Sequence, residues 1–159
     1  MAQISESHER YRTRETLCAD VAAVLNSSVH WGTKHAVLAE VTWVWSEFEG
    51  KYSETLQWSE AAWLLRAGDR KQLVHEHVVP KSVIIRELRK LERIADTEGV
   101  RVVLDRLCIG AVITKDEDRQ LSQLGFRKRM PVGWEASGDP WARYAAAQID
   151  VRRAVAVVR

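Results

Sequence analysis

Two short apolar runs, at residues 73–79 and 108–113, lead directly into sequences that start helices. The first run ends at Pro80, a residue suited to the first turn of a helix. The second is followed by Thr114-Lys115-Asp116-Glu117, the Thr-x-x-Glu pattern of a capping box. Both apolar runs are short, contain valine or isoleucine and are flanked by loops, and these features favour strands. The two strands can pair antiparallel or be joined by a crossover, and the sequence leaves both arrangements open.

The rest of the chain is predicted to be mostly helical. Apolar residues at helical spacing indicate helices over 14–25, from Thr33 to Gly50, over 60–66 after a capping Ser59, after Pro80, and over about 141–149. Gly99 is interpreted as a boundary, and residues 102–107 and the last nine residues could each be helix or strand. The prediction is therefore an α+β fold, a mostly helical single domain with a small two-stranded β element at 73–79 and 108–113.

Composition places the chain among ordinary globular proteins, because 46% of its 159 residues are hydrophobic and 29% are charged. One globular domain over 1–159 is predicted, with residues 1–10 frayed and the basic, aromatic tail 126–159 packed on the domain. No apolar run approaches the roughly 20 residues of a membrane helix, so no membrane partner is expected. The N-terminus has no signal segment and only two cysteines occur, which predicts a cytoplasmic location.

The net charge of +2 is unevenly distributed. Residues 1–79 hold 8 Lys/Arg against 11 Asp/Glu, whereas residues 80–159 hold 16 against 11. A basic half of this kind can face a nucleic-acid backbone, and a solvated surface is the alternative.

His75 and His77 are the candidate chemical groups. In an extended segment their side chains point to one face and Glu76 points to the other. Two neutral imidazoles can bind one divalent ion, or one can bind while the other acts as a base. The acidic residues that could complete such a shell are Asp105, Asp116, Glu117 and Asp118. The alternatives are histidines in the core or at a partner interface, and acidic residues that only stabilise a helix N-terminus.

The segment His75-Glu76-His77-Val78-Val79-Pro80 resembles the first motif of HNH-type (ββα-metal) nucleases. The resemblance implies an HNH-like endonuclease, a metal-dependent hydrolase of phosphodiesters in nucleic acid. The family's middle Asn and last His have no counterpart, because the only Asn is Asn26 and no His follows His77.

In that reading His77 is the general base, and Glu76 acts with it or, like His75, binds the metal. Asp116 or Asp118 takes the place of the missing ligand. The cofactor is one divalent ion, Mg²⁺, Mn²⁺ or Zn²⁺. The side chains that would contact phosphates are Lys81, Arg127, Lys128 and Arg129.

A second reading is a non-catalytic helical module that binds a protein partner or a second copy of itself. Its binding face would be formed by the tryptophans, of which the chain has seven, and by the apolar tail. A toxin or a phage or defence accessory protein is compatible with either reading. The sequence leaves open DNA versus RNA, any base preference, the metal and the oligomeric state.

Overall fold

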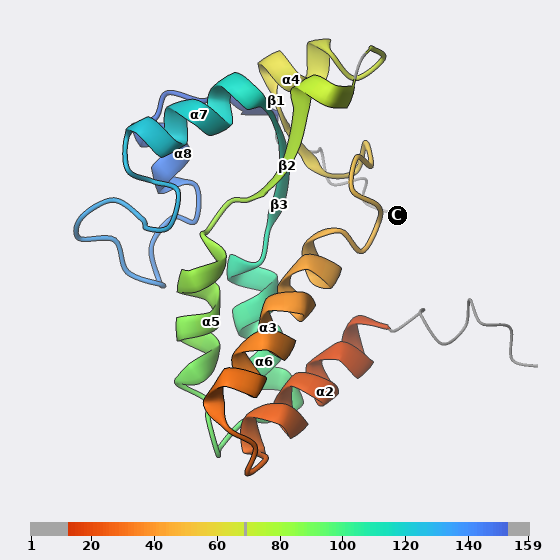
Figure 1. Ribbon diagram of the computed structural model, residues 1–159, viewed down its shortest axis with the longest axis vertical. Coiled ribbons are helices and arrows are strands. Elements are labelled where there is room, and N and C mark those ends of the chain that lie inside the picture. The colour runs from red at the N-terminus through yellow and green to blue at the C-terminus, as the bar shows by residue number, and fades with distance from the viewer. Residues whose placement is uncertain (1–12, 69, 153–159) are drawn as a thin grey trace, which may run out of the picture.

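The computed structural model describes residues 13–68 and 70–152. Helices and a small mixed sheet make up this part of the chain, which confirms the α+β, mostly helical class. Figure 1 shows the longer helices gathered at one end of the molecule and the sheet with its covering helices at the other. The fraying predicted for residues 1–10 concerns a segment outside the described residues. The last seven residues, 153–159, also lie outside them.

The helical end consists of α2 (Arg14–Asn26), α3 (Trp31–Ser46), α5 (Lys81–Arg89) and α6 (Thr97–Leu107). The apolar faces of these helices form one core, which contains Leu17, Val21, Leu25, Leu38, Ile84, Leu88, Val100 and Leu104. Packing of amphipathic faces, rather than intrinsic propensity, accounts for most of the stability of helices of this length.

Two helix starts differ from the sequence prediction because side chains cap them earlier than expected. Helix α3 begins two residues before Thr33, since Nδ1 of His30 accepts the backbone N–H of Gly32 at 3.1 Å. Gly99 is not a boundary but lies in the first turn of α6, where its N–H donates to the carboxylate of Asp96 at 2.7 Å. The ambiguous segment 102–107 is helical and forms the second half of α6.

The sheet has the strand order β2-β3-β1-β4. Strands β2 (Leu73–His77) and β3 (Gly110–Thr114) are the two predicted strands, and they pair antiparallel with His75 opposite Val112. Strand β1 (Gln57–Ser59) lies parallel to β3, and β4 (Val151–Arg152) lies antiparallel to β1. Strand β1, with three residues, is too short for a periodic signal and was not predicted, whereas β4 lies in the last nine residues, for which helix and strand were both left open.

Short helices cover the sheet: α4 (Glu60–Leu64), the 3-10 turn η1 (Arg70–Gln72), α7 (Lys115–Gln123) and α8 (Ala142–Ala146). The predicted caps at Ser59 and Thr114 are confirmed, the second as a complete capping box. Beyond α7 the chain returns to the sheet, where Tyr144, Ala147 and Ile149 pack with residues of β3 and α7. None of the helices in the described ranges is long and apolar enough to cross a lipid bilayer.

Candidate functional site

Strand β2 places His75 and His77 on the same face, as the alternation of an extended segment requires. Their ring centroids are 6.3 Å apart. The indole of Trp43, on α3, lies against both rings, with centroid distances of 5.9 Å to His75 and 4.3 Å to His77. Only 4% of His75 and 3% of His77 is exposed, so the face that carries the imidazoles is closed beneath α3.

The hydrogen bonds of His77 are made inside the protein. Its Nε2 is 3.1 Å from the carbonyl oxygen of Thr42 and 3.3 Å from Oγ of Ser46. Because a carbonyl oxygen only accepts, Nε2 carries the hydrogen. Burial lowers the pKa of His77 to about 4, so the ring is neutral at pH 7. With Nε2 donating to the main chain, Nδ1 is the nitrogen left to accept a proton, but only 3% of His77 is exposed to water.

His75 is packed tightly but weakly hydrogen-bonded. A Cβ atom at Gly110 would lie only 2.5 Å from its Nε2, which explains a glycine at that position. Its Nδ1 is 3.4 Å from Oε1 of Glu47, yet neither ring nitrogen has a hydrogen-bond partner within the described part of the chain. Burial lowers the pKa of His75 to about 4, so the Glu47 contact joins a carboxylate to a neutral ring rather than forming an ion pair.

Glu76 points away from the imidazoles, as predicted, and meets a buried arginine. Nη2 of Arg143, on α8, donates to Oε1 of Glu76 at 2.5 Å. Arg143 also donates to the carbonyl oxygens of His77, of Val78 at 2.6 Å and of Phe126 at 2.9 Å. Burial raises the pKa of Glu76 and the guanidinium opposes that rise. These contacts tie α8 and the chain after α7 to strand β2.

The acidic residues of α7 do not join the histidines. Asp116 has a side chain that is 84% exposed and pairs with Arg119. Glu117 closes the capping box and accepts a hydrogen bond from Oγ of Ser59 at 2.7 Å. Asp118 lies near Glu76, on the opposite side of β2 from the imidazoles.

The candidate Asp105, on α6, pairs instead with Arg101 at 3.4 Å. Over residues 13–68 and 70–152, no group of three or more His, Cys, Asp or Glu side chains is placed to hold a metal ion. The residues that the resemblance assigns to the metal thus form no common ligand set here, and the divalent ion stays a prediction.

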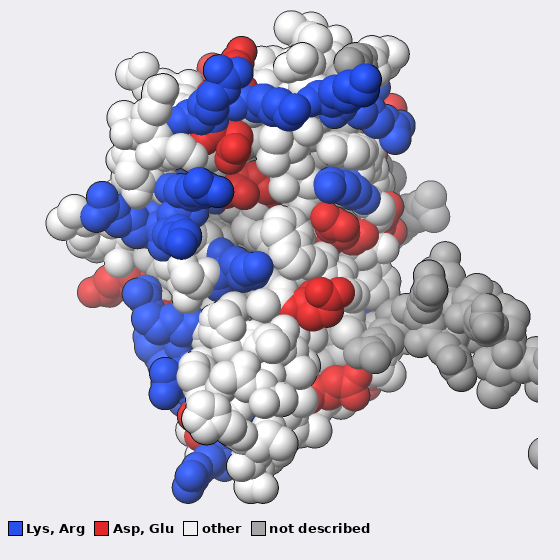
Figure 2. Space-filling model, in the orientation of Figure 1, with Lys and Arg blue, Asp and Glu red and all other residues white. Residues whose placement is uncertain are grey.

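Of the predicted phosphate contacts, Arg127, Lys128 and Arg129 adjoin other basic side chains of helix α5, whereas Nζ of Lys81 lies 5.5 Å from the ring centroid of Trp43. Lysines and arginines of α5 adjoin those of the loop after α7, because Oγ of Ser82 donates to the carbonyl oxygen of Lys128 at 3.0 Å. We call this set the basic surface; it consists of Arg86, Arg89, Lys90, Arg127, Lys128 and Arg129. Figure 2 shows blue side chains along the left of the view, over α5 and this loop.

Three members of the basic surface, Arg86, Arg89 and Lys90, were not predicted from the sequence. Their spacing of three and four residues along a predicted helix was a usable signal, since such residues share one helix face. The carboxylate of the same helix, Glu87, is buried beside them, 2.6 Å from Nζ of Lys90 and 3.6 Å from Nε of Arg86. It offsets only part of the local positive charge.

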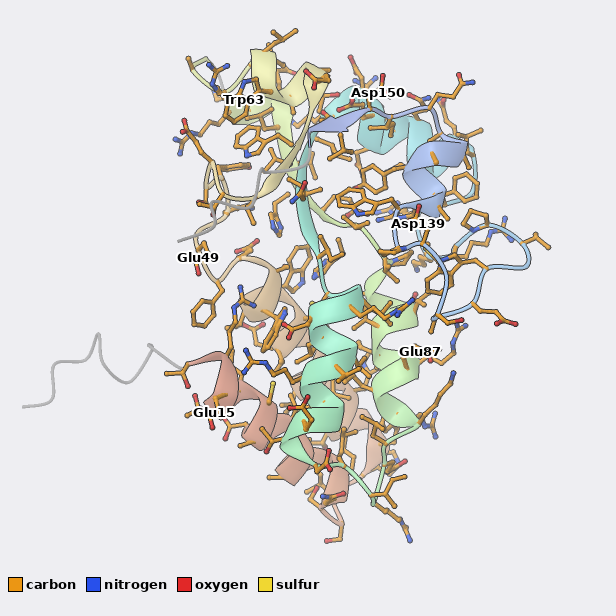
Figure 3. The ribbon with its side chains drawn as sticks, turned by 180° about the vertical axis from the view of Figure 1, so that it is seen from behind. Glu15, Glu49, Trp63, Glu87, Asp139 and Asp150 are labelled. Carbon is orange, nitrogen blue, oxygen red and sulfur yellow. The ribbon has the colours of Figure 1, made fainter. Side chains whose placement is uncertain are left out.

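The tryptophans do not form the exposed face that the protein-binding reading expects. All seven lie within the described ranges, and each is buried or half-buried. Trp45 and Trp58 belong to the cores of the two ends of the molecule, and Trp43 covers the histidines. Figure 3 shows Trp63 on the side of the molecule away from α5, which carries the label Glu87.

Comparisons with known proteins identify no relative: no protein-family model, no curated protein and no solved structure matches the chain. Function is therefore inferred from the geometry of this chain alone.

Proposed function

We propose that the protein binds nucleic acid through the basic surface. The observation that carries this proposal is the convergence of α5 and the loop after α7, two segments about 40 residues apart in sequence, into one exposed field of positive charge. Arginine and lysine side chains neutralise phosphates and release condensed counterions, which supplies most of the affinity of binding that is independent of base sequence.

The basic surface is held in place before any ligand arrives. The Ser82–Lys128 hydrogen bond fixes the loop to the first turn of α5. Nε of Arg129 donates to the carbonyl oxygen of Gly125 at 2.9 Å, which shapes the loop itself. Arg89 lies over the ring of Trp31 with 4.2 Å between its Cζ and the ring centroid. Because these contacts already hold the basic side chains and their loop in place, binding a phosphate backbone costs less entropy.

Binding at this surface requires none of the residues around the buried histidines. Hydrolysis of the bound strand, with His77 as base and a divalent ion, stays a prediction of the resemblance. The burial of His77 and the pairing of Glu76 with Arg143 favour a structural role for both residues. The geometry thus supports binding better than cleavage.

Salt-dependent binding to a fluorescein-labelled 20-nucleotide strand tests the proposal, with fluorescence anisotropy as the readout. Each phosphate contact contributes about −0.7 to the slope of log K against log salt concentration for a single strand. Arg86→Ala combined with Lys128→Ala should reduce the slope by about 1.4 and weaken binding about 20-fold near 0.1 M salt.

The matched control is Arg66→Ala combined with Arg101→Ala, which removes the same charge outside the basic surface. Arg66 lies over the ring of Trp63, and Arg101 pairs with Asp105 on α6. An equal loss of affinity in both double variants would mean that net charge, and not this surface, governs binding. Absence of binding by the wild type at low salt would refute the proposal itself.

The same strand, incubated with Mg²⁺ or Mn²⁺ and analysed on a denaturing gel, tests cleavage. Binding without cleavage supports the binding function alone. Cleavage that needs the metal and is lost in His77→Ala would instead establish the hydrolysis implied by the resemblance.

A further inference from the structure

We propose that the basic surface selects single-stranded nucleic acid by taking up one unpaired base in a pocket at its centre. This inference rests on the proposed function and adds the class of ligand. The pocket has a volume of about 250 Å³ and lies between α5 and the loop after α7. Its lining consists of Ser82, Val83, Arg86, Lys128, Arg129, Met130, Pro131 and Trp134.

The lining combines an apolar wall with a cationic rim. Pro131 and Trp134 are half-buried and supply most of the exposed apolar surface of the lining, whereas Val83 and Met130 are buried. Arg86 and the Lys128–Arg129 pair are exposed around it. A phosphate alone needs no apolar wall. A nucleobase does match this combination, because its ring faces are apolar, its edges are polar and a phosphate follows it along the strand.

Trp134 is held in position by its own loop. Its Nε1 donates to the carbonyl oxygen of Asp139 at 2.7 Å, and its backbone N–H donates to that of Pro131 at 3.1 Å. Arg106, on α6, donates from Nε to the carbonyl oxygen of Ala136 at 2.7 Å. In Figure 3 the loop that carries Asp139 lies on the same side of the molecule as Glu87 of α5. An indole fixed in this way is a prepared stacking platform, since little side-chain entropy is lost when a base arrives.

Base pairing excludes this mode of binding. In a duplex the ring faces stack on one another and only the base edges reach the grooves, so an apolar pocket cannot take up a base without extruding it. The phosphates of a duplex would still meet the rim. The pocket therefore predicts a preference for unpaired strands on top of a salt-dependent affinity for any nucleic acid.

Three labelled probes test the inference by anisotropy at one salt concentration: a 20-nucleotide DNA strand, an abasic strand with the same number of phosphates, and a 20-base-pair duplex. The wild type should bind the strand with bases about fivefold or more tightly than the abasic strand, the ratio expected for one stacked base. Trp134→Ala should abolish this ratio and leave the affinity for the duplex unchanged. Trp63→Ala, another half-buried tryptophan but outside the pocket, should retain it.

The outcomes separate the inference from the proposed function. Equal wild-type affinity for strands with and without bases overturns the pocket but leaves binding through the basic surface intact. Absence of binding to all three probes overturns the proposed function and the inference with it. If Trp134→Ala does not fold, Trp134→Leu replaces it, since leucine keeps apolar bulk at the pocket but offers no aromatic face to a base. Full retention of the preference for bases in either variant overturns the inference.

Discussion

Replacement of Arg143 by methionine should lower the free energy of unfolding by about 3–5 kcal/mol, the cost of leaving the half-buried carboxylate of Glu76 and several main-chain carbonyl oxygens without their donor. The side chain of Arg143 is 0% exposed and donates to the carboxylate of Glu76 and to the carbonyl oxygens of Val78 and Phe126. Methionine fills a similar volume but donates nothing. The loss is a large part of the about 5–15 kcal/mol that stabilises a domain of this size.

The cost of Arg143→Met should depend on pH. Burial raises the pKa of Glu76, and Arg143 opposes that rise. Without the guanidinium the pKa rises further, so the folded variant binds more protons than the unfolded chain above the ordinary pKa of glutamate. Its free energy of unfolding then falls as the pH rises from that ordinary value through the raised one. The difference between wild type and variant should therefore be smaller at about pH 4 than at about pH 7.5.

Urea unfolding followed by tryptophan fluorescence and far-UV circular dichroism measures these differences, and a double-mutant cycle with Glu76→Gln isolates the pair. We expect a coupling energy of about 2 kcal/mol or more. Arg101→Met is the control, because the side chain of Arg101 is 45% exposed and its surface ion pair is worth less than about 1 kcal/mol. A cost below about 1 kcal/mol for Arg143→Met, or a cycle that closes within about 0.5 kcal/mol, would refute the reasoning.

Three further predictions concern the sheet. Burial lowers the pKa of both His75 and His77 to about 4, so the unfolded chain binds more protons than the folded chain between about pH 4 and about pH 6.5. The wild type should therefore lose stability as the pH falls through this range, and a variant with both histidines replaced by glutamine should lose less. Urea unfolding at several pH values measures both changes. Gly110→Ala should cost about 1–3 kcal/mol, because its Cβ would lie 2.5 Å from His75, whereas Gly68→Ala, whose Cβ would meet nothing closer than 3.5 Å, should cost little; equal thermal shifts for the two would contradict this. Thr114→Val should cost about 1 kcal/mol in the same unfolding assay through loss of its helix cap, and an unchanged free energy would show that the cap contributes nothing.

In the candidate site, the direction of each side chain on β2 follows from the local sequence, but its exposure to water does not. Alternation along an extended segment predicts that His75 and His77 share a face and that Glu76 does not, and both statements hold in the structure. Whether that face is open depends on α3, about 30 residues away, which lays Trp43 across the rings. The motif is local, but its exposure to water is not.

The basic surface also combines local signals in the sequence with contacts that depend on the tertiary structure. The positive charge at residues 127–129 is visible in the sequence, and the face formed by Arg86 and Lys90 follows from helical spacing. The meeting of Arg86 with Lys128 and Arg129 around one pocket depends on the return of the chain after α7, which Ser82 and Arg106 hold by hydrogen bonds to main-chain carbonyls. Hydrogen bonds of this kind leave no pattern in sequence because every residue offers the same carbonyl acceptor.

The sequence by itself determined the elements whose signals are local: the capping box at Thr114, the start of α4 at Ser59, the helical stripes and the two longer strands, since caps and periodicity act within a few residues. Only the tertiary structure decided that β2 and β3 pair antiparallel, that strands of three and two residues complete the sheet, and that Glu76 meets Arg143, 67 positions away. Such choices are set by the burial of apolar surface and by the need to pair buried polar groups across the whole chain, and neither requirement can be evaluated until the chain has folded.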